Sequence, residues 1–246
     1  MKYILVIGFL LTNIFAYSQD KSGRLTNADL NVVSWLRADM DESADVPENE
    51  EGIALTKYFK AELVDEATYH AKLNLATNPV VSDNRFKKSN GVITLKCRDT
   101  IVTFTDIGGD GEDFREYNYD SYLPALKQYI VTATYYEQYD YIYVDMNSGR
   151  QTSFGGGIPY LAPNRKNLLV VSHEPYENTV SFSLINLRNN EFTTIASTEF
   201  KHWMPAMDAD NLPFFAMDSY FYCIAIAIKD KDKPEVARQY VRIKLL

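Results

Sequence analysis

The stretch Val180-Ser181-Phe182-Ser183-Leu184 alternates apolar side chains with hydroxyl side chains. This period of two residues is typical of a β-strand with one buried face. The stretch belongs to residues 129–197, in which short strand patterns and turn signals follow one another without a helical pattern. The sequence therefore predicts an antiparallel meander in this part of the chain.

Strand patterns continue on both sides of this meander. Before it, Val92–Cys97 and Ile101–Thr105 are predicted to form a hairpin, and after it Tyr220–Lys229 and Val236–Leu245 are predicted strands. Tyrosine and phenylalanine, with 18 and 13 copies, are residues that strands favour. We therefore expect a mainly β fold with a small helix-containing region near the N-terminus.

Near the N-terminus, apolar residues recur at intervals of three and four residues: Leu30, Val33, Leu36 and Met40. This spacing predicts a helix, and Thr26 with Asp29 three residues later resembles a capping box at its start. The acidic run Asp39–Gly52 that follows is predicted to be a loop.

Residues 54–75 allow two interpretations. In the first, Tyr58–Val64 is a strand and Asp65 caps a short helix that ends at Leu73. In the second, a single helix runs through the segment and places Leu55, Phe59, Leu63 and Ala67 on one face. We favour the strand followed by the helix, and both interpretations remain open at this point.

The first eighteen residues have the pattern of a secretory signal peptide. Lys2 supplies a positive charge, Ile4–Phe15 is a short apolar run, and Ala16-Tyr17-Ser18 offers small residues for cleavage before Gln19. An uncleaved anchor is the alternative, but spanning a bilayer takes about 20 apolar residues. We therefore expect a periplasmic or secreted protein that has no stable membrane insertion after cleavage.

Composition indicates where the remaining chain divides into regions, and the net charge argues against a nucleic-acid partner. Asn78-Pro79 interrupts the pattern before it, and residues 82–91 are polar and basic, as a linker would be. The predicted regions are the signal peptide 1–18, a mixed region 19–88 and a β region 89–246. The formal net charge of -8, without clustered Lys and Arg, argues against nucleic acid as a partner.

Three segments in the β region resemble one another, at intervals of about 40 residues: Tyr122–Val131, Tyr160–Val170 and Trp203–Phe214. The turn Ala162-Pro163-Asn164-Arg165-Lys166 precedes an apolar strand in the second segment. On these residues the chain, over roughly 119–246, resembles the WD-repeat-like β-propeller blades of exported bacterial proteins. The resemblance implies a small or incomplete propeller that acts as a binding platform, and it implies no reaction.

Two groups of side chains are candidate ligand sites. Tyrosines gather around one predicted turn and could be strand packing or a stacking platform for sugar rings or a peptide: Tyr135, Tyr136, Tyr139, Tyr141 and Tyr143. The loop after residue 105 resembles part of a calcium loop at Asp106, Asp110 and Gly111, but Gly108 and Tyr117 depart from it. Its candidate ligands, in what is otherwise a solvated acidic loop, are Asp106, Asp110, Glu112 and Asp113.

The two cysteines bear on ring closure. Cys97 shares a predicted strand face with Ile93 and Leu95, and Cys223 follows Phe221 in a late strand. If the blades closed into a ring, the first and last strands would meet, and an oxidising compartment would permit a disulfide between these cysteines. The alternative is a pair of buried free thiols.

The sequence favours an exported binding or interaction module over an enzyme. The expected partner is a protein or a carbohydrate, and no cofactor is implied apart from calcium at the acidic loop. The three histidines, His70, His173 and His202, lack a metal-binding spacing. Two alternatives remain: a secreted hydrolase with dispersed active-site residues, and an acidic inhibitor of a basic secreted enzyme.

Overall fold

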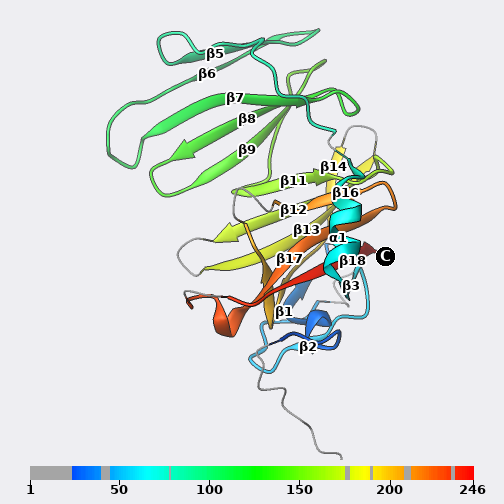
Figure 1. Ribbon diagram of the computed structural model, residues 1–246. Helices are drawn as coiled ribbons and strands as arrows, with labels where there is room; N and C mark the ends of the chain where they lie inside the picture. Colours follow the sequence, from blue (N-terminus) through cyan, green and yellow to red (C-terminus); the bar gives the residue numbers. More distant parts are fainter. Residues whose placement is uncertain are drawn as a thin grey trace, which may run out of the picture.

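The computed structural model describes residues 24–39, 45–77, 79–174, 178–188, 191–207, 212–233 and 236–246. Within these ranges the protein is mainly β and its sheets are antiparallel (Figure 1), which confirms the predicted fold class. The predicted signal peptide lies outside the described residues. No helix among those described is long and apolar enough to cross a membrane.

The predicted meander of residues 129–197 is divided between two sheets, and its later part forms most of a six-stranded sheet. Its strand order is β11-β12-β13-β14-β1-β2, so a consecutive meander is extended by two strands from the N-terminal region. The bounds are β11 Gly157–Leu161, β12 Asn167–Glu174, β13 Thr179–Arg188, β14 Glu191–Phe200, β1 Val32–Arg37 and β2 Ile53–Ala54.

A second meander and a hairpin precede this sheet in the chain. The four-stranded sheet has the order β10-β9-β8-β7, and the predicted hairpin β5-β6 is confirmed beside it. The bounds are β5 Val92–Lys96, β6 Ile101–Thr105, β7 Arg115–Leu123, β8 Gln128–Tyr135, β9 Tyr139–Asp145 and β10 Gln151–Ser153.

The third large sheet joins strands from the two ends of the described chain. Its order is β3-β18-β17-β16-β4, and β15 also pairs with β17. The bounds are β3 Phe59–Val64, β4 Ala76–Thr77, β15 Trp203–Pro205, β16 Phe214–Ala216, β17 Tyr220–Ala227 and β18 Arg238–Leu245. The helical segments are η1 Asp29–Asn31, α1 Glu66–Leu73 and η3 Ile228–Asp230.

The sheets are stacked face to face, with an apolar cluster between each pair of layers (Figure 1). Strand β12 shows how: Leu168 and Val170 contact the four-stranded sheet, whereas Leu169 and Val171 contact the sheet of β17 and β18. Because both faces are covered, β12 is continuously apolar and does not alternate. Helix α1 covers the outer face of the third sheet through Tyr69.

The helix predicted from Leu30 to Met40 is wrong. Only the single turn η1 forms, and the chain then enters β1, which pairs with β14. The capping box does form, because Thr26 N donates to Asp29 Oδ2 at 2.8 Å and Asp29 N donates to Thr26 Oγ1 at 3.3 Å. Pairing with β14 and the β-branched Val32-Val33 pair outweigh the helical spacing.

For residues 54–75, the strand followed by a helix is confirmed, and the single long helix is wrong. Asp65 Oδ1 accepts from Thr68 N at 2.7 Å and caps α1. Strand β3 runs beside β18 along its whole length. The predicted boundary at residue 88 stays a prediction, although β1 and β3 share sheets with strands that come after it.

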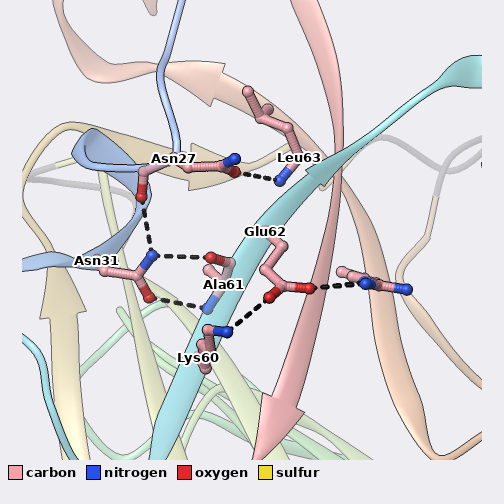
Figure 2. A network of polar contacts seen from close by, with 7 residues as sticks. Asn27, Asn31, Lys60, Ala61, Glu62 and Leu63 are labelled. Atoms are coloured by element: carbon pink, nitrogen blue, oxygen red, sulfur yellow. Dashed lines mark hydrogen bonds and ion pairs between the residues drawn. The ribbon is translucent and has the colours of Figure 1, made fainter.

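The outer edge of β3 is covered by asparagine side chains (Figure 2). Asn31 Nδ2 donates to Ala61 O at 2.8 Å, and Asn31 Oδ1 accepts from Ala61 N at 2.9 Å. Asn27 Oδ1 accepts from Leu63 N at 2.7 Å. The amide groups therefore replace a neighbouring strand and protect an edge that could otherwise pair with another chain.

Both cysteines carry free thiols, so the structure does not contain the disulfide considered from the sequence. Cys97 is only partly buried and packs against the cluster that contains Ile93 and Leu95, whereas Cys223 is buried in the cluster between the other two sheets. Burial raises the pKa of both thiols. Within the described ranges the sheets form no closed barrel or propeller.

Candidate functional site

A cleft of about 920 Å³ lies where the ends of three hairpins meet. It is bordered by the turn between β8 and β9, by the connection from β10 to β11, and by the ends of β12 and β13. This volume lies within the range of ligand pockets in proteins. We call it the Asp140 cleft, after the residue described below.

Two features of the backbone shape the cleft. The turn from β8 to β9 is closed by Tyr135 N, which donates to Gln138 O at 2.7 Å. On the opposite side, a Cβ atom at Gly157 would clash with the hydroxyl of Ser172, and one at Gly156 would lie 3.1 Å from Tyr139 O. A side chain at Gly157 would therefore displace Ser172 of β12, and one at Gly156 would crowd the backbone of Tyr139 in the turn between β8 and β9.

Asp140 is the most unusual side chain of the cleft. Only 8% of it is exposed, and its Oδ2 accepts from Ser153 Oγ at 2.6 Å. Its Oδ1 is buried and has no hydrogen-bond partner among the residues that the structure describes. A buried polar atom left without a partner costs about 1–3 kcal/mol, and more when it is charged. Asp140 thus lines the cleft, but its unpaired oxygen is covered.

Of the five predicted tyrosines, two line the cleft, two pack in the interior and one is exposed outside the cleft. Tyr135 and Tyr139 line the cleft, whereas Tyr136, which is 54% exposed, is not among its lining residues. Tyr143 is fully buried and contacts Phe154 with ring centroids 5.0 Å apart, and Tyr141 packs against the same cluster.

Burial affects the pKa values of both a lining tyrosine and an interior tyrosine. Burial, followed by the neighbouring Tyr117 and Asp140, raises the pKa of Tyr135, whereas Arg115 lowers it. Burial also raises the pKa of Tyr143 well above its ordinary value, and its hydroxyl has no partner among the described residues. Of the five tyrosines, Tyr135 and Tyr139 are the two that line the cleft.

No residue of the candidate calcium loop lines this cleft, although Arg115 at the end of the loop pairs with Tyr135. Asp106 Oδ2 accepts from Lys88 Nζ at 2.7 Å, and Asp106 Oδ1 accepts from Tyr117 N at 2.9 Å. Burial alone would raise the pKa of Asp106, but these hydrogen bonds outweigh it and lower the pKa. Asp110, Glu112 and Asp113 are exposed. Calcium binding here stays a prediction, and a cation would compete with Lys88.

Among the described residues, no three His, Cys, Asp or Glu side chains lie close enough together to hold a metal ion. Of the histidines, His173 lines the cleft, and its Nε2 lies 3.3 Å from Asn178 Oδ1.

Sequence reasoning missed Asp140, Ser153 and His173. One signal was available: Asp140 shares a strand face with Ile142 and Val144, where a charge is unexpected.

Comparisons of the chain with protein-family models, with curated proteins and with solved structures found no match.

Proposed function

We propose that the protein is a binding module whose ligand occupies the Asp140 cleft. The observation that carries this proposal is the cleft of about 920 Å³ at the ends of three hairpins, with Tyr135, Tyr139 and the largely buried Asp140 among its lining residues. Tyrosine rings at the rim would supply contact area at a small cost in conformational entropy.

We further propose that the stacked sheets act as an open, propeller-like platform. Two consecutive four-stranded meanders support this, β7 to β10 and β11 to β14, because each has the strand order of one blade. The ligand cleft lies between the ends of these two meanders. Loops and strand ends at the rim of a rigid β scaffold are common places for binding residues.

Binding should depend on Tyr139 and not on its neighbour Tyr136. We expect Tyr139→Ala to weaken ligand binding about tenfold, because loss of one aromatic contact costs on the order of 1–2 kcal/mol. Tyr136→Ala is the matched control and should change affinity less than about twofold. Amide NMR titrations with neutral oligosaccharides and with short peptides, one probe at a time, measure both effects.

The same titrations localise the ligand. Shift changes should be confined to residues 134–140, 153–157, 172–174 and 178–181. A probe that binds equally well to Tyr139→Ala, or that shifts residues far from these segments, would contradict the proposal. It would also fail if no oligosaccharide and no peptide in the panel bound.

We also propose that the protein is exported and that its mature form begins at Gln19. The basis is the charged start, the apolar run and the small residues Ala16 and Ser18 of the sequence. Mass spectrometry of the protein from the periplasm or the medium should give the mass of residues 19–246. Recovery of the chain with Met1 from the cytosol would contradict export.

A further inference from the structure

We infer that the free edge of β5 is a second binding site, which takes an extended acidic segment of another protein as an added β-strand. The hairpin β5-β6 lies at one end of the stacked sheets (Figure 1), and a groove of about 510 Å³ lies beside it. This β5 groove is lined by residues 85–87 and Ser89, which precede β5, and by Val92, Thr94 and Lys96 of β5 itself. It shares no lining residue with the Asp140 cleft, so the inference is independent of the proposed function.

One edge of β5 has no neighbouring strand over most of its length. Val92 N donates to Ser89 O, and Val92 O accepts from Ser89 N, both at 2.9 Å, so Val92 turns its backbone groups away from β6. Alternate residues of a strand turn these groups to the same edge, so those of Thr94 and Lys96 also face the groove. Lys96 O accepts from the Tyr129 hydroxyl at 3.1 Å. Within the described ranges, no strand pairs with this edge beyond Ser89.

The edge is open because a hairpin begins on it and does not continue. Asn90 and Gly91 have positive φ angles, 51° and 72°, as the tight turn of a two-residue hairpin requires. Ser89 and Val92 on either side of the turn form the first pair. The next pair of a longer hairpin would cover Thr94, but β5 pairs only with β6 there.

The chain before the turn leaves the hairpin because its side chains are held elsewhere. Lys88 Nζ donates to Asp106 Oδ2 at 2.7 Å. The ring centroid of Phe86 lies 5.1 Å from that of Tyr119 and 5.0 Å from that of Tyr129. These contacts hold the segment away from β5, and the space that a longer hairpin would fill is the groove. An extended guest therefore finds its site already formed, which lowers the cost of binding.

The groove is basic, although the chain has a net charge of -8. Arg85, Lys87 and Lys96 line it, and none of its lining residues is Asp or Glu. Arg85 is held by Asp83, to which its Nε donates at 2.6 Å. Lys87 and Lys96 are exposed, and neither forms an ion pair with any residue that the structure describes. Charge complementarity across an interface selects the partner, so an acidic guest is favoured.

A second copy of the chain fits this edge less well. Pairing of two β5 edges would bring Lys87 and Lys96 of both copies together, and like charges across a ladder are destabilising. In the addition of a foreign strand, backbone hydrogen bonds supply affinity, and side chains at alternate positions supply specificity. The groove offers the first through Thr94 and the second through its two lysines.

The geometry fixes which guest residues carry the negative charges. The pairing of Ser89 with Val92 is antiparallel, and a guest that continues it is antiparallel to β5 as well. Guest residues opposite Thr94 and Lys96 then lie on the same outer face as these residues and turn their own N–H groups towards β5. Carboxylates therefore belong at these positions, and the residues between them turn their N–H groups away.

The first test compares two peptides, acetyl-Thr-Glu-Val-Glu-Val-Glu-Thr-amide and the same peptide with Gln in place of each Glu. We expect the acidic peptide to bind the protein about fivefold more tightly in amide NMR titrations at about 20 mM salt. Shifts should be confined to residues 85–97. Raising the salt to about 300 mM should reduce the preference.

N-methylation of the acidic peptide tests the backbone pairing. Methyl groups on the Glu amides should abolish binding, because these N–H groups are the ones that bond β5. Methyl groups on the Val amides, which face away from β5, should change affinity less than about twofold. Equal effects of the two methylations would overturn strand addition.

Variants test the protein side of the groove. Thr94→Pro removes an N–H that faces the groove and no hydrogen bond to β6, so it should abolish binding with the fold intact. Lys96→Gln should weaken binding of the acidic peptide about threefold and leave the Gln peptide unaffected, a test that stands even if the proline disturbs β5. Lys166→Gln, at an exposed lysine between β11 and β12, is the matched control and should change neither affinity.

The outcomes bear on this groove alone. Equal affinity for the acidic and Gln peptides, or shifts outside residues 85–97, would overturn the inference. Failure of the acidic peptide to bind would overturn it as well, and would leave the proposal for the Asp140 cleft standing, because that proposal is tested with other probes and in other residues.

Discussion

Replacement of Phe182 by alanine is expected to lower the free energy of unfolding by about 3–5 kcal/mol. Phe182 lies in β13 and is fully buried between the sheets. Its ring centroid lies 5.1 Å from that of Phe200 and 6.0 Å from that of Trp203. The substitution therefore removes two aromatic contacts and leaves a cavity in the largest apolar cluster. Urea unfolding followed by circular dichroism measures the change.

The neighbouring Ser183 is the matched control. Its hydroxyl lies 2.8 Å from Ser197 Oγ, a hydrogen bond whose loss should cost about 1 kcal/mol. Ser183→Ala should thus be far milder than Phe182→Ala, although the two residues are adjacent in one strand. Equal costs would contradict the assignment of their side chains to opposite faces of β13.

Replacement of Asn31 by alanine is expected to lower the free energy of unfolding by about 2–4 kcal/mol. The side chain bonds both backbone groups of Ala61, which is 1% exposed, so its removal leaves a buried donor and a buried acceptor without partners. Asn27→Ala removes one bond, to the amide of Leu63, and should cost about 0.5–1.5 kcal/mol. Urea unfolding of both variants measures the difference.

Asn31→Ala should also promote self-association. The uncovered stretch of β3 would present free backbone groups to a second chain, as an unprotected sheet edge does. Sedimentation of the variant at increasing concentration should show species larger than the wild-type protein. Sedimentation identical to wild type, together with unchanged stability, would show that Asn31 does not protect this edge.

Local sequence patterns predicted those strands in which buried and exposed side chains alternate along the chain. The alternation around Phe182 and the hairpin of β5 and β6 follow from period two, and the Asp65 cap predicted the start of α1. Strand β1 was missed because its spacing is also that of a helix, and its partner β14 lies far away in sequence. A pattern within one segment cannot report a partner of that kind.

The candidate site could be predicted only in part, for the same reason. The sequence shows a cluster of tyrosines around the turn between β8 and β9, and this turn borders the cleft through Tyr135 and Tyr139. Alternation along β9 could not show that Tyr143 would be covered on its face by another sheet. Asp140 accepts a hydrogen bond from Ser153 on the neighbouring strand, and the cleft that it lines forms only where the ends of β12 and β13 meet the turn between β8 and β9.

The pairing of β3 with β18 has a consequence for the growing polypeptide. Strand β3 finds its partner in residues 238–245, and Leu25 exchanges two hydrogen bonds with the side chain of Gln239, 214 positions away. Until residues 238–245 have been synthesised, the third sheet lacks the strand that lies between β3 and β17. Such long-range closure is slow, so this sheet should close after the two local meanders have formed.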